Sequence, residues 1–198
     1  MMEQSSAKVV SVSRTDAILI IDVLNDLEFP GGANVLPWAR KLVAPLQWVC
    51  SKARRAGVPI IFVNDNFGVW TGGWQAVYRH CARRGARGAA VTRRMKPLKN
   101  DYVLLKPRHS ACFATPLVQL LEHLRIKRLI LAGISTNLCV LITAHDAAMH
   151  KYPIVVLSDC CAAESDFDHN SVLTQLKRYI GATICRSTEL RIRRSARK

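Results

Sequence analysis

Short apolar runs recur along this chain, and longer stretches with helical spacing lie between them. The runs stand at 17–22, 58–64, 102–105, 128–134, 154–157 and 182–185. Short runs without polar alternation are typical of strands that are buried on both faces. We therefore predict a sheet whose two faces are both covered by other parts of the chain.

The stretches between the runs carry helix signals. Pro37 suits the first position of a helix that Gly57 ends, and Thr115 suits the cap before Pro116. Helices are predicted at 37–56, 115–125, 137–150 and 169–180. Strands that alternate with helices predict an α/β fold, a three-layer αβα sandwich around a mostly parallel sheet.

The length of 198 residues suits one domain. Hydrophobic residues make up 49% of the chain and charged residues 22%, which excludes a disordered or fibrous protein. With no repeat and no linker, we expect a single domain over 1–198, with an extension at 1–16 and a basic tail at 191–198. The segment 65–101 holds five of the ten glycines and is expected to be irregular.

Charge is the unusual property of the chain. There are 29 Lys and Arg against 14 Asp and Glu, a formal net charge of +15. The run 83–96 holds six basic residues and no acid, and 191–198 holds five in eight. One interpretation is a surface for nucleic acid or another anion, or an anionic substrate. The other is a set of solvated loops, and the lack of a nucleic-acid motif favours it.

Seven cysteines are irregularly spaced and form neither a Cys-x-x-Cys pair nor a Cys/His ligand pattern. The N-terminus lacks the apolar core of a signal peptide, and no apolar run is long enough to cross a membrane. We expect a reduced, cytoplasmic protein whose cysteines mostly fill the core.

Three residues whose side chains are suited to catalysis stand at predicted strand ends. Asp22 and Lys106 each follow a strand, and Cys139 opens a helix just past another. A helix start and a nearby lysine both lower a thiol pKa, and a carboxylate in reach can move the thiol proton. Ligands of parallel sheets bind at this edge, so the three form a candidate nucleophilic site. Each residue alone also fits an ordinary structural role.

The sequence motifs around these residues resemble those of the isochorismatase-like cysteine hydrolase superfamily. The similar blocks are 17–32 (AILIIDVLNDLEFPGG), 59–70, 103–117 (VLLKPRHSACFATPL), 129–147 (LILAGISTNLCVLITAHDA) and 155–165. Their order and spacing agree over 17–190. The resemblance implies a Rossmann-like parallel sheet with helices on both faces, and a homo-oligomer, commonly a dimer or tetramer.

The resemblance also implies roles for single residues. Asp22 is the expected general acid/base, Lys106 its charge partner and Cys139 the nucleophile. A cis peptide is expected between Ile134 and Ser135, with the backbone amides of Ser135 and Cys139 forming an oxyanion hole.

Departures from the family pattern narrow the expected chemistry. Nicotinamidases carry an Asp-x-His metal motif after the second strand, where this chain reads Asp65-Asn66-Phe67-Gly68. We therefore predict no metal and no other cofactor. The namesake isochorismatases lack the nucleophilic cysteine, so Cys139 favours hydrolysis of a C–N bond in a small amide or ureido compound through an acyl-enzyme.

Aromatic and amide side chains complete the expected substrate pocket. We expect Phe29, Trp70 and Phe113 to line it and Asn66 to orient a substrate amide. The alternative for the aromatic residues is core or dimer packing. His109 is a polar residue beside the expected site, and the favoured explanation for it is a solvated loop histidine. A second function remains open at this point, that of a basic anion- or nucleic-acid-binding protein built on a hydrolase scaffold.

Overall fold

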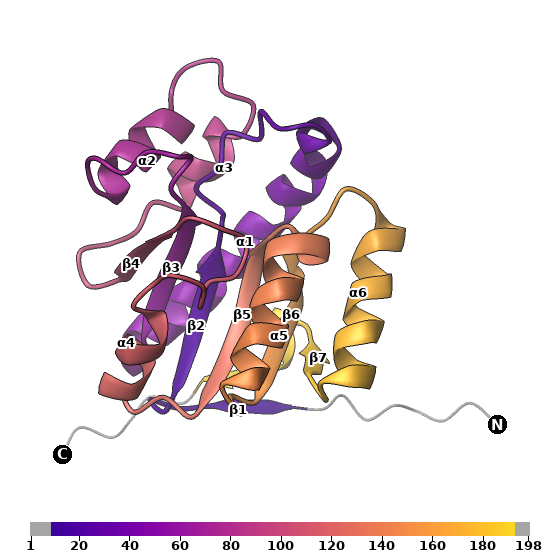
Figure 1. The fold of residues 1–198 in the computed structure, drawn as a ribbon. Helices are drawn as coiled ribbons and strands as arrows, with labels where there is room; N and C mark the ends of the chain where they lie inside the picture. Colours follow the sequence, from indigo (N-terminus) through magenta and orange to yellow (C-terminus); the bar gives the residue numbers. More distant parts are fainter. Residues whose placement is uncertain (1–8, 193–198) are drawn as a thin grey trace.

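The computed structural model describes residues 9–192 and has a six-stranded parallel sheet at its centre (Figure 1). The strand order is β4-β3-β2-β5-β6-β7. These strands are β2 (Asp16–Ile21), β3 (Ile60–Asp65), β4 (Tyr102–Lys106), β5 (Arg128–Ile134), β6 (Ile154–Ala162) and β7 (Thr183–Cys185). The predicted parallel, Rossmann-like sheet is confirmed, because the order reverses between β2 and β5 as in doubly wound folds.

Helices cover both faces of the sheet, as the buried runs predict (Figure 1). They are α1 (Gly32–Ala56), α2 (Trp74–Cys81), α3 (Ala89–Arg94), α4 (Leu117–His123), α5 (Leu141–Met149) and α6 (Asp166–Tyr179), with a π-helix η1 (Thr136–Val140) and a 3₁₀ turn η2 (Ser187–Glu189). Side chains alternate between the two cores: Ile18 and Ile20 pack toward α1, Leu19 and Ile21 toward α4, α5 and α6.

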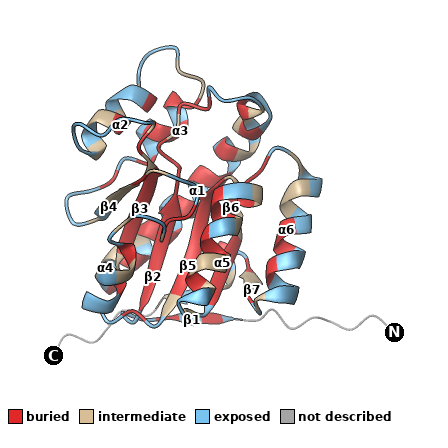
Figure 2. Ribbon diagram, viewed as in Figure 1, coloured by how far each residue is buried: buried red, intermediate tan, exposed pale blue. Residues whose placement is uncertain are grey.

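The central strands β2, β3 and β5 are buried except at Asp65 and Arg128, which are partly exposed at one end of β3 and of β5 (Figure 2). The switch between β2 and β5 is very tight, because Gly133 pairs with Ile21. A Cβ at Gly133 would lie 2.0 Å from the carbonyl oxygen of Ile21. Glycine at this position therefore brings the end of β5 close to the end of β2.

Helix α1 begins five residues before the predicted start, and Pro37 and Pro45 lie inside it. Pro37 removes one intrahelical hydrogen bond. The added turn nevertheless buries Val35 in the core. The stabilisation from this burial outweighs the loss of the hydrogen bond at Pro37. The predicted end is confirmed, because Gly57 has φ 70 and its N–H bonds to the carbonyls of Ala53 and Arg54.

Three further differences concern short elements. The segment 65–101 contains α2 and α3 rather than irregular chain alone, and α4 begins at Leu117, after Pro116 rather than after Thr115. Strand β1 (Val10–Val12) pairs in parallel with β8 (Leu190–Ile192), so parts of the expected extension and tail meet in a second small sheet. The rest of both, residues 1–8 and 193–198, lies outside the described residues.

None of the helices in the described part of the chain is both long and apolar enough to cross a membrane.

Candidate active site

Asp22 lies directly after β2, at the point where the strand order reverses. Its backbone has φ 50, and its N–H donates to the carbonyl of Val63 at 3.1 Å. This conformation turns the carboxylate toward the ends of β3 and β4. Oδ1 accepts a hydrogen bond from the N–H of Asp65 at 2.6 Å, and Oδ2 lies 2.7 Å from Nζ of Lys106.

Lys106 is the last residue of β4 and is fully buried. Besides its ion pair with Asp22, its ammonium donates to the carbonyl of Arg108 at 3.0 Å and lies 3.8 Å from Sγ of Cys139. An ammonium group has three donors and no acceptor, so these three contacts account for its hydrogen-bonding capacity. The contacts fix Lys106 between the carboxylate and the thiol.

Cys139 lies in the π-helix that precedes α5. The carbonyl of Ser135 accepts hydrogen bonds from the N–H groups of Leu138 at 3.2 Å and Val140 at 3.1 Å, and the second spans five residues. Short π-helical turns of this kind recur at functional sites. The peptide bond between Ile134 and Ser135 is cis, as the resemblance implies. The structure thus brings Asp22, Lys106 and Cys139 together from three separate elements.

The charges of the site are enclosed. Burial raises the pKa of Asp22 above its usual range, and the Lys106 ammonium only partly offsets this. Burial alone lowers the pKa of Lys106, but Asp22 and Cys139 outweigh it and raise the pKa. Lys106 therefore carries its positive charge at neutral pH.

The expectation of a lowered pKa for Cys139 is wrong. Burial raises the pKa of this thiol, the negative charge of Asp22 adds to the rise, and Lys106 only opposes it. The helix start cannot compensate for removal from solvent. At neutral pH the resting thiol therefore keeps its proton, and a base must remove that proton before attack.

A cleft of about 640 Å³ opens above Cys139 at the carboxyl ends of the strands. Phe29 lines this cleft, as predicted. Its other walls come from the segment after β2, the end of β3, η1 and the segment after β6. The lining residues are Asp22, Asn25, Asp26, Glu28, Phe29, Pro30, Asp65, Phe67, His109, Ile134, Ser135, Asn137, Leu138, Cys139 and Glu164.

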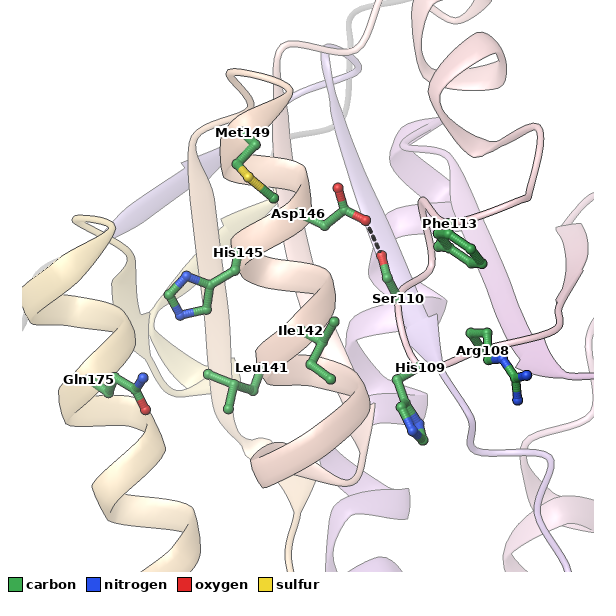
Figure 3. A pocket seen from close by; sticks show the side chains of 10 residues that line it. All are labelled: Arg108, His109, Ser110, Phe113, Leu141, Ile142, His145, Asp146, Met149 and Gln175. Atoms are coloured by element: carbon green, nitrogen blue, oxygen red, sulfur yellow. Dashed lines mark hydrogen bonds between the residues drawn. The ribbon is translucent and has the colours of Figure 1, made fainter.

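Three residues expected in the pocket lie elsewhere. The side-chain oxygen of Asn66 accepts the N–H of Gly68 at 2.9 Å and so stabilises a turn, and Asn66 is not among the residues that line the cleft. Trp70 is 78% exposed on the segment between β3 and α2 and does not line the cleft. Phe113 lines a separate groove beside α5, shown in Figure 3.

The cleft walls are acidic, although the protein as a whole is basic. Asp26, Glu28, Asp65 and Glu164 join Asp22 in the lining, whereas no lysine or arginine of residues 9–192 does. Asp26 is held by His80 at 2.9 Å and Arg83 at 3.1 Å. These two partners and the N–H of Glu28 lower the pKa of Asp26 in spite of its burial, so this wall keeps its negative charge.

Much of the basic run 83–96 serves these walls or neighbouring carbonyls. Arg83 pairs with Asp26, and Arg87 lies 3.5 Å from Glu28. Arg93 donates twice to the carbonyl of Ala82, at 3.0 and 2.7 Å. These arginines therefore attach the α2–α3 segment to the wall of the cleft and to itself.

His109, for which the sequence favours the role of a solvated loop residue, is a neighbour of the thiol. Its Nδ1 lies 3.9 Å from Sγ of Cys139, and its side chain lines the cleft. The sequence points to His109 only through its position three residues after Lys106. That position is informative only when β4 is known to end at Lys106. In the described part of the chain, no group of three His, Cys, Asp or Glu side chains is arranged to hold a metal ion.

Comparisons with known proteins agree with this geometry. The family model "Isochorismatase domain" matches residues 16–189. An uncharacterized isochorismatase family protein of Bacillus subtilis, YaaI, is 35% identical over 174 residues, which cover 87% of this chain and 95% of the relative.

Solved structures show the same likeness. The N-carbamoylsarcosine amidase of Thermoplasma acidophilum is 28% identical with a TM-score of 0.66, covering 87% of this chain and 96% of that one. An isochorismatase family protein of Desulfovibrio vulgaris is 27% identical with a TM-score of 0.71, covering 89% and 96%. The sequence-based prediction of family and fold is confirmed: this chain belongs to the isochorismatase family of hydrolases.

Proposed function

We propose that this hydrolase is a metal-independent cysteine amidohydrolase that cleaves a C–N bond of a small amide or ureido compound. The observation that carries the proposal is the enclosed set formed by Asp22, Lys106 and Cys139 at the base of a cleft, with Nζ 2.7 Å from the carboxylate and 3.8 Å from the thiol. A thiol, a base and a fixed positive charge are the parts that covalent acyl transfer needs.

In the first half-reaction, Asp22 takes the proton of the Cys139 thiol as Sγ attacks the substrate carbonyl carbon. The backbone amides of Ser135 and Cys139 stabilise the developing oxyanion. The tetrahedral adduct then collapses, the C–N bond breaks, and Asp22 returns the proton to the leaving nitrogen. The products of this half are an amine or ammonia and a thioester on Cys139.

In the second half-reaction, Asp22 takes a proton from water, and the resulting hydroxide attacks the thioester carbonyl. The C–S bond breaks, a carboxylic acid leaves, and the proton on Asp22 returns to the sulfur. The raised pKa of Asp22 supports this role, because a carboxylate with a higher pKa is a stronger base. Lys106 stays charged throughout and stabilises negative charge on Asp22 or on the sulfur.

The acidic walls narrow the substrate class. A carboxylate- or phosphate-bearing substrate would meet Asp26, Glu28, Asp65 and Glu164 with no lysine or arginine of the described residues in the lining. Neutral or cationic amides rich in N–H donors match these acceptors. The basic residues of 65–101 are therefore no argument for an anionic substrate, since Arg83 and Arg87 pair with the walls.

Two relatives support hydrolysis at a C–N bond. One is the N-carbamoylsarcosine amidase named above, and another is a nicotinamidase of Bacillus subtilis, 25% identical with a TM-score of 0.66 over 86% of this chain and 98% of that one. The test is a screen of neutral and cationic amides and ureido compounds with detection of released ammonia or amine. Wild type should release product, and Cys139→Ala should not.

The homo-oligomer remains a prediction, which we propose on the resemblance together with two exposed apolar residues, Phe113 beside α5 and Met149 at the end of α5. Light scattering should give a mass of at least two chains. A clean monomer at micromolar concentration would contradict it.

Anion or nucleic-acid binding has less support. Arg83, Arg87 and Arg93 make contacts within the protein, and residues 193–198 of the basic tail lie outside the described residues. A salt-dependent mobility shift with DNA that persists in Cys139→Ala would favour this second function.

A further inference from the structure

The Cys139 thiol lies between two bases, of which one is buried and the other is exposed to solvent. Asp22 is 3% exposed, whereas His109, whose Nδ1 is 3.9 Å from Sγ, is an exposed residue. His109 also lines both the cleft above Cys139 and the neighbouring groove beside α5. Figure 3 shows its ring toward the end of that groove that lies away from Met149.

We propose that His109 is a second proton acceptor for the Cys139 thiol and exchanges that proton with solvent. The inference rests on the proposed function, in which Cys139 is the nucleophile, and adds a residue to its chemistry. In the step, the Sγ–H proton moves to Nδ1 of a neutral imidazole. A thiolate and an imidazolium result, and the imidazolium releases a proton from Nε2 to water.

Burial of the Asp22–Lys106 pair explains why the Cys139 thiol needs a second proton acceptor to exchange its proton with solvent. Both carboxylate oxygens of Asp22 already accept hydrogen bonds, one from the N–H of Asp65 and one from Lys106. Lys106 is fully buried as well. A proton taken by Asp22 is thus confined to the site and suits internal transfer to the leaving nitrogen. His109 provides the route by which the resting thiol equilibrates with bulk water.

His109 is held in place, although its side chain is exposed. On one side, the carbonyl of Arg108 accepts a hydrogen bond from Lys106 at 3.0 Å. On the other, Ser110 donates to Asp146 at 2.5 Å, and the N–H of Ala111 donates to the hydroxyl of Thr143 at 3.0 Å. The segment that carries the imidazole is therefore attached both to β4 and to α5, and the distance from Nδ1 to Sγ follows from that attachment.

Several charged groups surround His109, but none of the described carboxylates lies within ion-pair distance of its ring. The titratable and charged groups around His109 are Cys139 on η1 and Lys106 on β4, which contacts both that thiol and the carbonyl of Arg108. The others share the groove or the cleft with His109: Arg108, His145 and Asp146 in the groove, and Asp22, Asp26, Glu28, Asp65 and Glu164 in the cleft. The thiol is the one polar side chain within contact distance of Nδ1 in residues 9–192.

The test measures alkylation of Cys139 by iodoacetamide, without substrate, at a series of pH values and resolved by peptide mass spectrometry. The alkylation rate of wild type should rise with pH in a step that requires the His109 side chain. His109→Gln should lose this step and react about tenfold more slowly above it, less than the 10²–10⁴ of a sole acid–base group because Asp22 remains. His145→Gln is the matched control, a histidine of the same groove that does not line the cleft, and it should behave as wild type.

Two further variants separate proton transfer from a structural effect. In Asp22→Asn, the alkylation that remains should depend on His109, so the double variant with His109→Gln should react more slowly than either single one. In His109→Ala, added imidazole should restore the rate in a saturable manner, since the side chain is exposed. Identical pH profiles for His109→Gln and wild type, or no rescue by imidazole, would overturn the proposal. The proposed function fails separately, if Cys139→Ala keeps wild-type turnover.

Discussion

The ammonium of Lys106 lies 2.7 Å from the carboxylate of Asp22, and both side chains are closed off from solvent. The pair is net neutral, so its burial costs less than burial of either charge alone. Lys106 opposes the rise that burial causes in the pKa of Asp22, and Asp22 in turn raises the pKa of Lys106. The pair thus places a base and a positive charge next to the thiol, where both are shielded from bulk water.

Asp22→Asn should remove proton transfer and leave binding intact. The amide keeps the shape of the carboxylate but does not accept the thiol proton at neutral pH. We expect kcat to fall by about 10²–10⁴ with little change in the affinity for a slow substrate analogue. Steady-state kinetics with calorimetric binding measures both, and an unchanged kcat would exclude Asp22 as the base.

Lys106→Met should reduce both stability and reactivity. The variant leaves the Asp22 carboxylate buried without its partner, a loss of about 3–5 kcal/mol in the free energy of unfolding. The double variant Asp22→Asn with Lys106→Met should recover most of that loss, because it buries no charge. Denaturant unfolding of the three proteins checks this, and equal stability of Lys106→Met and wild type would count against an enclosed ion pair.

Lys106→Met should also slow alkylation of Cys139, since Lys106 is the group that lowers the thiol pKa against burial and Asp22. The alkylation rate of Cys50, which lies in the other core beside α1, is the internal reference.

The acid limb of the pH profile should lie above that of an ordinary aspartate. Catalysis needs ionised Asp22, and burial raises its pKa, so activity should be lost on acidification at a pH above about 3.9. The profile of kcat/KM is best measured in His109→Gln, where that imidazole no longer contributes. An acid limb at or below the ordinary aspartate value would contradict the raised pKa.

Chelation should leave activity unchanged. Asn66 and Phe67 follow Asp65 where the resemblance places a metal-binding histidine in nicotinamidases, and the described residues hold no three-ligand cluster. Activity after extended EDTA treatment and desalting should match the untreated protein. Loss of activity that zinc or iron restores would show that the mechanism needs a metal.

The sequence predicts those features that depend on local pattern. The run 128–134 coincides with β5 because each of its apolar residues is buried in a parallel sheet, and Gly57 ends α1 because it has a left-handed conformation. The start of α1 was missed because burial of Val35 outweighs the local signal of Pro37. Strands β1 and β8 were missed because three residues carry too little pattern.

Within the site, the sequence predicts which residues meet better than it predicts the surroundings of their side chains. Asp22, Lys106 and Cys139 meet because parallel strands end at one edge of the sheet. The direction of the Cys139 pKa shift was wrong because burial is not visible in sequence. Trp70 and Phe113 were misplaced because a loop residue's sequence does not say which way its side chain points.

The central claim is that Cys139 forms a covalent acyl-enzyme, and intact-protein mass spectrometry during turnover of an amide substrate tests it most directly. Rapid acid quenching of wild type should show a mass increase equal to the acyl group, mapped by peptide analysis to Cys139. The increase should persist longer in a variant that is slow in the second half-reaction. Cys139→Ala should show neither the adduct nor turnover. Turnover at the wild-type rate by Cys139→Ala would contradict the mechanism.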